Sequence, residues 1–203
     1  MNIQIIAEHI KKLHRIDQTI IIGIDGLGGA GKSTISEKMC QILSAADFEV
    51  TVLHIDDFIH PKAVRYNDAY PEWECYYHLQ WRYDYLLNEV LLPVRDGNYC
   101  KGIELYDKDM DTYFIQQTEI PAGSILILEG IFLQRKELEG IFDLTIYLDI
   151  PEDIRLQRVL QRDGYIGDEA AIRAKYENRY FPAERHYVAE CNPQQKADCV
   201  ITE

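Results

Sequence analysis

Five short apolar runs are spread along the chain, with stretches of helical periodicity between them. The runs begin at Thr19 (TIIIGI), Glu49 (EVTVLHI), Ser124 (SILILEG), Leu144 (LTIYLDI) and Asp198 (DCVIT). Each is apolar almost without a break, as is typical of parallel strands that are covered on both faces. Strands that alternate with helices favour right-handed crossovers. We therefore predict an α/β fold with a five-stranded, mainly parallel sheet and helices on both of its faces.

Apolar residues spaced three to four positions apart predict the helices. Ile3, Ile6, Ile10 and Leu13 indicate a short N-terminal helix, and further helices are expected over residues 32–46, 73–94 and 151–163. Aromatic residues recur every fourth position at Trp73, Tyr77, Trp81 and Tyr85, so they would form one ridge of the third of these helices. This ridge favours packing on the sheet, although the N-terminal part of the segment, around Tyr66, Tyr70 and Trp73, could instead wall a pocket. The least regular segments are residues 61–72 and 97–123.

Composition narrows the class of protein. The 203 residues contain no internal repeat and no linker rich in Gly, Pro or Ser, so we expect one domain over residues 1–203. The net charge of -13 disfavours nucleic acid as a partner. No apolar run approaches the roughly 20 residues that cross a bilayer, and residues 1–16 lack the pattern of a secretory signal. We expect a cytoplasmic protein without a membrane partner, whose five widely spaced cysteines are buried thiols.

Residues Gly26–Ser33, with the sequence GLGGAGKS, match the phosphate-binding pattern G-x-x-x-x-G-K-[ST]. The match lies between a predicted strand and a predicted helix, which is the context that this pattern requires. Glycines let backbone N–H groups surround a phosphate, and a helix N-terminus adds unpaired donors and the positive end of its dipole. A glycine-rich turn without a ligand would not explain the lysine and serine that follow. The nucleotide-binding candidates are Gly26, Gly28, Gly29, Ala30, Gly31, Lys32, Ser33 and Thr34.

Acidic residues follow two of the other apolar runs. Asp56 and Asp57 end the second run, and Glu129 ends the third. Ligands of such sheets lie beyond the carboxyl ends of the strands, so these carboxylates are expected beside the glycine loop. One can accept the proton of a hydroxyl group during phosphoryl transfer, and another can bind Mg²⁺. Capping of the next helix is the alternative, and the spacing does not choose between Asp56 and Asp57.

A cationic stripe follows the fourth apolar run. Arg155, Arg158 and Arg162 share one face of the helix predicted there. Further basic residues follow up to position 185. We interpret residues 155–180 as a small helical lid that brings positive charge to the transferred phosphoryl group and excludes water. An ordinary solvated surface helix is the alternative interpretation.

Taken together, these segments resemble the uridine kinase-like branch of the P-loop kinases, a branch close to nicotinamide riboside kinase and more distantly related to phosphoribulokinase. The resemblance rests on GIDGLGGAGKST, HIDDF, Tyr106–Asp107, LILEGIF, RLQRVLQRD and the C-terminal RYFPAERHYV segment. It implies a P-loop NTPase fold, ATP, Mg²⁺ and transfer of the γ-phosphoryl group to a primary hydroxyl of a small molecule. By position it implies Asp56 as general base, Lys32, Ser33 and Thr34 as phosphate and metal ligands, Glu129 near the metal, and Arg158 and Arg162 as lid arginines.

The resemblance weakens where the acceptor would bind. In uridine kinases an aromatic residue and a histidine follow the Tyr-Asp pair, whereas Lys108 and Asp111 stand there in this chain. The His-Pro-Asp segment that contacts ribose in that family is absent, so uridine is not the predicted acceptor. The acidic residues at 107, 109 and 111 fit either ligand binding or an exposed loop. The candidates for contact with the acceptor are Asp57, Tyr66, Tyr106 and Asp107.

The leading hypothesis is therefore an ATP-dependent small-molecule kinase in which Lys32, Asp56, Arg158 and Arg162 act in catalysis, with Mg²⁺ held through Ser33 and Glu129. A regulatory nucleotide switch is the alternative, although the N-K-x-D pattern of guanine-specific GTPases is absent. A non-enzymatic binding module is the third hypothesis. The identity of the acceptor and the formation of a homo-oligomer are left open by the sequence.

Overall fold

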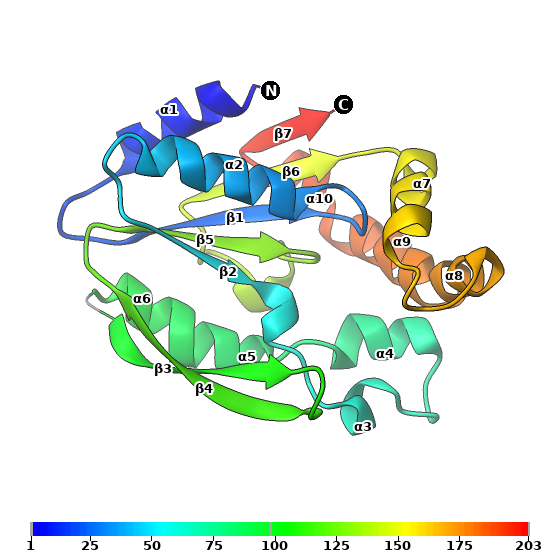
Figure 1. Cartoon of the computed structure of the whole chain (residues 1–203). Helices are drawn as coiled ribbons and strands as arrows, with labels where there is room; N and C mark the ends of the chain where they lie inside the picture. The colour runs from blue at the N-terminus through cyan, green and yellow to red at the C-terminus, as the bar shows by residue number, and fades with distance from the viewer. Residues whose placement is uncertain (1, 98, 203) are drawn as a thin grey trace.

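The computed structural model describes residues 2–97 and 99–202. A five-stranded sheet with the strand order β2-β5-β1-β6-β7 lies at its centre (Figure 1). The strands are β1 (Ile20–Gly26), β2 (Val50–His54), β5 (Ile125–Gly130), β6 (Leu144–Asp149) and β7 (Cys199–Thr202). Every pair of neighbours is parallel. The predicted α/β fold with a five-stranded sheet is confirmed, and this sheet is parallel throughout. The expectation of buried strands is wrong for the edge strands β2 and β7, most of whose residues are half-buried or exposed.

Alternate residues of each central strand enter two different apolar clusters. Ile22 of β1 and Ile127 of β5 pack with α1 (Ile3–Leu13) and α2 (Lys32–Ser44). Ile21 and Leu126, which point to the opposite face, pack with the helices that lie below the sheet in Figure 1. Burial on both faces explains why these strands are apolar without a break.

The remaining elements extend this layered arrangement. On the chain between β2 and β5 lie η1 (Ile55–Asp57), α3 (Lys62–Arg65), α4 (Glu72–Leu79), α5 (Tyr83–Tyr85), η2 (Leu86–Leu91), α6 (Leu92–Arg95), β3 (Tyr99–Asp107) and β4 (Thr112–Ile120). After β5 come η3 (Lys136–Leu138), α7 (Glu152–Arg162), α8 (Glu169–Lys175), η4 (Tyr176–Tyr180), α9 (Phe181–Cys191) and α10 (Pro193–Lys196). The carboxyl ends of β1, β5 and β6 point toward the side of the molecule that carries α7 (Figure 1).

The segment predicted as a single aromatic helix is broken. α4 ends at Leu79, and Trp81 pairs with Ile59 in an isolated antiparallel bridge. The backbone N–H groups of His60 and Arg82 donate to the carbonyl groups of Gln80 and Phe58, so backbone pairing replaces the helical hydrogen bonds there. The predicted continuous ridge is therefore wrong. Its members still pack on the larger apolar cluster, as the packing interpretation predicts.

Residues 97–123, predicted to be irregular, contain a β-hairpin. β3 and β4 pair antiparallel in a register that runs from Tyr99 opposite Ile120 to Asp107 opposite Thr112. Most of β4 is exposed and carries polar residues, so no apolar run marks it in the sequence.

Both π-helical segments are followed closely by a proline. η2 and η4 are π-helical, and Pro93 and Pro182 follow them at the first turns of α6 and α9. A proline inside a continuous helix cannot donate a hydrogen bond and its ring clashes with the carbonyl group four residues earlier. Widening of the preceding turn relieves this clash.

The cysteine prediction holds only in part. Cys75, Cys191 and Cys199 are buried, whereas Cys40 is half-buried and Cys100 is exposed. The expectation of buried thiols is wrong for the last two, because they lie on the outer surfaces of α2 and of the β3–β4 hairpin. In the described part of the chain, no helix has the length and apolar character that crossing a membrane requires.

Candidate functional site

The glycine loop leaves the end of β1 and leads into α2 at Lys32. Gly29 and Gly31 have φ angles of 78° and 93°, which favour glycine. A Cβ atom on Gly29 would also lie 2.8 Å from the carbonyl oxygen of Arg155, so α7 approaches the loop too closely for any side chain at this position. No side chain caps α2, and its first turn contains no acidic residue. The N-terminus of α2 therefore keeps the unpaired N–H groups that bind anions.

Two neighbouring cavities adjoin this loop. The larger cavity, of about 700 Å³, is lined in part by Lys32, Ser33, Asp56 and Glu129. The smaller cavity, of about 270 Å³, lies at the N-terminus of α2 and is lined by Gly29, Gly31, Lys32, Ser33, Thr34, Arg158, Val159 and Arg162. Residues from the ends of several strands and from α7 thus meet around the glycine loop. Among the other loop candidates, Gly28 also lines the larger cavity, Gly26 ends β1 and Ala30 is buried.

Ser33 and Glu129 contact each other at the wall of the larger cavity. The Ser33 hydroxyl donates to Oε1 of Glu129 at 3.0 Å, and Nδ1 of His54 lies 2.6 Å from the same oxygen. Burial by itself would raise the pKa of Glu129, but the hydrogen bond from His54 and the charge of Lys32 hold it below the ordinary value. The hydrogen bond to Glu129 raises the pKa of His54. The carboxylate of Glu129 is therefore kept ionised next to a hydroxyl group. His54 was not predicted from the sequence.

The Lys32 ammonium group lies among carboxylates. It donates to the carbonyl oxygen of Leu27 at 3.2 Å. Burial lowers the pKa of Lys32, and the negative charges of Glu129 and Asp56 oppose that shift. The lysine is thus held at the point where the glycine loop, β2 and β5 meet.

A buried aspartate at the end of β1 stabilises the start of the glycine loop. Asp25, in β1, is fully buried, and burial raises its pKa. Its Oδ2 accepts hydrogen bonds from the Tyr187 hydroxyl at 2.5 Å and from Nε2 of Gln134 at 3.0 Å, and its Oδ1 accepts the N–H of Gly26 at 2.8 Å. This network ties the start of the glycine loop to α9 and to the segment after β5. It was not predicted from the sequence.

An ion pair from two distant helices holds both backbone groups of Gly28. Glu184 of α9 accepts the Gly28 N–H at 2.8 Å, and Nη1 of Arg155 donates to the Gly28 carbonyl oxygen at 2.9 Å. The two side chains also form an ion pair at 2.8 Å, with 3% and 2% of each side chain exposed. Arg155 is therefore not part of a cationic face directed at a ligand, and that part of the stripe interpretation is wrong. Its role is to position the loop.

Replacement of Arg155 by alanine is expected to lower the free energy of unfolding by about 3–5 kcal/mol, because it leaves the Glu184 carboxylate buried without its cation. Urea denaturation followed by circular dichroism measures this change. Arg173→Ala is the matched control, since it removes an exposed i,i+4 pair with Glu169 that contributes about 0.3–0.5 kcal/mol. Equal losses of unfolding free energy in the two variants would contradict a stabilising role for the buried Arg155–Glu184 pair.

The arginines predicted to belong to a lid differ in their surroundings. Nη1 of Arg158 lies 3.4 Å and 3.3 Å from the carbonyl oxygens of Gly29 and Ala30. Arg162 lines both cavities and forms an ion pair with Asp163 at 2.6 Å. Arg179, which the sequence places among the lid cations, is buried in the wall of the larger cavity.

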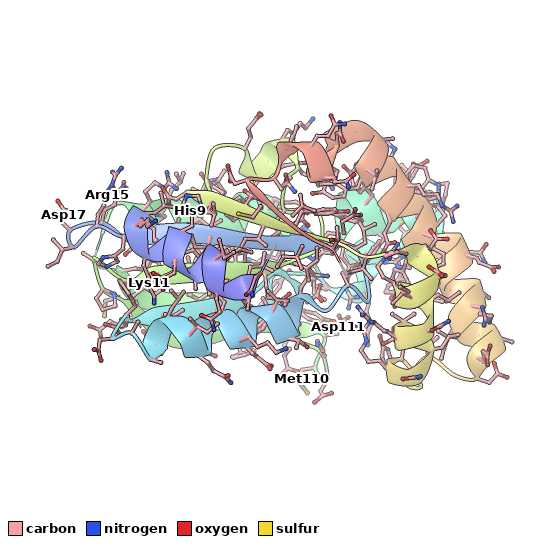
Figure 2. All side chains as sticks on the ribbon, turned by 90° about the horizontal axis from the view of Figure 1, so that it is seen from above. His9, Lys11, Arg15, Asp17, Met110 and Asp111 are labelled. Carbon is pink, nitrogen blue, oxygen red and sulfur yellow. The ribbon has the colours of Figure 1, made fainter. Side chains whose placement is uncertain are left out.

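The four acceptor candidates separate into two groups. Tyr66 and Tyr106 line the larger cavity, whereas Asp57 and Asp107 are not among its lining residues. The Asp107 carboxylate accepts the N–H groups of Asp109 and Met110, so it caps the turn of the β3–β4 hairpin. Asp111 accepts the hydroxyl of Tyr106 at 2.6 Å. Figure 2 shows Asp111 nearer the end of the molecule that carries α7, and Arg15 and Asp17 at the opposite end.

Comparison with known proteins gives concordant matches. The model of a family described as phosphoribulokinase / uridine kinase matches residues 21–203. A uridine kinase from Clostridium novyi (strain NT) is 29% identical over 153 residues, covering 71% of this chain and 68% of that protein. A uridine kinase from Limosilactobacillus reuteri (strain DSM 20016) is 27% identical over 147 residues, covering 71% of this chain but only 65% of that protein, slightly less than two thirds.

A solved structure, described as a possible uridine kinase from Bacillus stearothermophilus, superimposes with a TM-score of 0.80 and 29% identity. The superposition covers 98% of this chain and 96% of that chain. The likeness therefore includes the α7–α9 region as well as the sheet and the glycine loop.

Proposed function

This chain belongs to the phosphoribulokinase / uridine kinase family, and from this premise we propose that it transfers the γ-phosphoryl group of ATP to a hydroxyl group of a small molecule. The observation that carries the proposal is the uncapped N-terminus of α2, with Lys32 in a cavity of about 700 Å³ that Asp56 also lines. This arrangement provides an anion site and a carboxylate in one cavity. The active unit proposed is the single domain of residues 1–203, with residues 155–180 as its lid.

In the proposed reaction the acceptor oxygen attacks the γ-phosphorus atom and forms a new P–O bond. The bond from that phosphorus atom to the β–γ bridging oxygen breaks, and ADP leaves with its electron pair. Asp56 accepts the proton of the acceptor hydroxyl. Lys32, together with Arg158 and Arg162, stabilises the negative charge on the transferred group. The N–H groups of Gly28 and Ala30 donate within the protein, so the other N–H groups of the glycine loop and those of the first turn of α2 orient the phosphates.

The residues at the cavity wall fit Mg²⁺. Ser33 and Glu129 offer a hydroxyl and a carboxylate oxygen, which contact each other at 3.0 Å, and Mg²⁺ prefers such ligands. Among the described residues no group of three or more His, Cys, Asp or Glu side chains could hold a metal ion. The remaining ligands would be phosphate oxygens and water, as is usual for this ion. Bound there, Mg²⁺ would neutralise phosphate charge.

The test is ADP release from Mg²⁺-ATP across a panel of nucleosides, vitamin ribosides, sugars and hydroxy acids. We expect acceptor-dependent ADP release and a phosphorylated product that mass spectrometry detects. ATP hydrolysis at one slow rate with every compound would instead favour a nucleotide switch. We propose the cytoplasm as the location of this reaction, since ATP is supplied there and the family's substrates are small metabolites.

A further inference from the structure

Two arginine side chains are buried in the wall of the larger cavity without an acidic partner. Arg65 ends α3 and is 8% exposed, and Arg179 lies in η4 and is 1% exposed. Both line the larger cavity. The other two buried arginines, Arg135 and Arg155, each form an ion pair with a glutamate. Within the part of the chain that the structure describes, Arg65 and Arg179 form none.

The contacts of this arginine pair are to uncharged oxygens. Arg65 donates from Nε at 2.6 Å and from Nη2 at 2.7 Å, and Arg179 donates three hydrogen bonds of 3.1–3.2 Å. The accepting atoms are the carbonyl oxygens of His60, Arg65 and Glu72, the amide oxygen of Gln80 and the hydroxyl oxygen of Tyr106. These acceptors fix the orientation of both guanidinium groups. These acceptors carry no charge. Tyr106 in turn donates to the Asp111 carboxylate, so Arg65 has an indirect counter-charge, whereas the hydrogen bonds of Arg179 lead to none. A buried cation without a counter-charge is unfavourable.

Each arginine keeps a donor for a ligand. Nη1 of Arg65 and Nε of Arg179 have no hydrogen-bond partner among the described residues. The ring of Tyr66 contacts both guanidinium groups. Its centroid is 4.4 Å from Cζ of Arg179 and 5.4 Å from Cζ of Arg65. Aromatic contact of this kind holds a guanidinium group in place while leaving its N–H edge available.

The arginine pair lies apart from the smaller cavity at the N-terminus of α2. Neither arginine lines that smaller cavity, whereas both line the larger one together with Asp56. Lys62 and Lys108 line the larger cavity as well. Three further carboxylates also line it, but each has a partner of its own: Glu129 contacts His54, Asp163 pairs with Arg162, and Glu184 pairs with Arg155. The cavity that contains the proposed general base therefore also contains cationic side chains that none of these carboxylates contacts directly.

We propose that the acceptor carries an anionic group, a carboxylate or a phosphate, which binds Arg65 and Arg179 while its hydroxyl group faces Asp56. This inference rests on the proposed function and narrows its substrate class. The planar N–H edges of arginine match carboxylate and phosphate oxygens in geometry as well as in charge. A neutral nucleoside would leave the guanidinium group of Arg179 without a counter-charge, and that of Arg65 with only its indirect contact to Asp111. The anionic group itself takes no part in the transfer and leaves unchanged with the product.

A matched series of probes tests the charge requirement. Ribose, ribonate and ribose 5-phosphate share one carbon skeleton. Ribose carries no anionic group, ribonate carries a carboxylate and ribose 5-phosphate carries a phosphate. Each is titrated by calorimetry into the full-length protein saturated with Mg²⁺ and a non-hydrolysable ATP analogue, so that the α2 N-terminus is already occupied. We expect at least one anionic member to bind about tenfold more tightly than ribose. The better of the two anionic probes identifies the source of the negative charge.

Variants connect this binding to the arginine pair. Arg65→Gln should weaken binding of the preferred anionic probe about tenfold and leave ribose binding and binding of the ATP analogue unchanged. Arg173→Gln is the matched control, because Arg173 is exposed and pairs with Glu169 outside the cavity. Thermal melts followed by circular dichroism establish whether the variants are folded. If Arg65→Gln does not fold, the comparison of the three probes on the unsubstituted protein still decides the question.

Two results would overturn the inference. One is that ribose binds as tightly as both anionic probes, or more tightly. The other is a folded Arg65→Gln variant that binds all three probes as the unsubstituted protein does. Failure of the ATP analogue to bind in the presence of Mg²⁺ is a different result, since it would count against the proposed function itself.

Discussion

Replacement of Lys32 by alanine is expected to lower kcat/KM for acceptor-dependent ADP release by about 10³-fold. Lys32 begins α2 at the glycine loop and lies in the charge field of Glu129 and Asp56. Without its ammonium group, these carboxylates would repel the phosphates that the loop is proposed to bind. Both ATP affinity, measured by calorimetry, and turnover are expected to fall, and the effect on turnover is the larger.

Lys38→Ala is the control for this variant, because Lys38 lies on the exposed side of the same helix. We expect its activity to match that of the unsubstituted protein. Full activity of Lys32→Ala, in a preparation that melts as a folded protein, would disprove the assignment of the anion site to this loop.

Replacement of Asp56 by asparagine is expected to lower kcat by about 10²–10⁴-fold while ATP affinity stays nearly unchanged. The substitution preserves the size of the side chain but removes its ability to accept a proton. Asp56 lines the larger cavity beside Lys32 and Glu129. Steady-state kinetics with the identified acceptor, together with calorimetry of ATP binding, separate the two effects.

The adjacent carboxylate provides the comparison. Asp57 follows Asp56 directly but is not among the residues lining the cavity, so Asp57→Asn should reduce kcat far less. A similar loss in both variants, or a parallel loss of ATP binding in Asp56→Asn, would remove Asp56 from the role of general base.

The sheet could be predicted from the sequence because of its burial. Parallel strands covered on both faces read as continuous apolar runs, and β1 and β5 are buried at every residue. The β3–β4 hairpin gives no such signal, since its apolar residues Phe114 and Ile115 are exposed and the four residues that follow them are polar. The break at Trp81 was also not predictable, because it depends on backbone pairing with the segment around Ile59.

In the candidate site, too, features set by a local sequence pattern could be predicted, whereas contacts between distant segments could not. The glycine loop is a continuous pattern, and Asp56 and Glu129 end apolar runs, so strand topology alone places them near one another. The Glu184 contact with Gly28 joins residues 156 positions apart. No spacing rule in the sequence links such residues. The hydrogen bonds of Asp25 and the burial of Arg65 without an ion pair also depend on contacts between distant segments, so the sequence did not predict them.

The apolar cluster formed by α7, α8, η4 and α9 affects how this region can move. Val159, Ile172, Tyr176 and Phe181 pack against one another in a cluster separate from those of the sheet. Val159 and Ile172 belong to α7 and α8, whereas Tyr176 and Phe181 belong to η4 and α9, so a rotation of α7 and α8 alone would expose apolar surface to water. The same rotation would break the hydrogen bond from Arg155 to the Gly28 carbonyl oxygen. Movement of this region away from the glycine loop is therefore opposed by an apolar and a polar contact together.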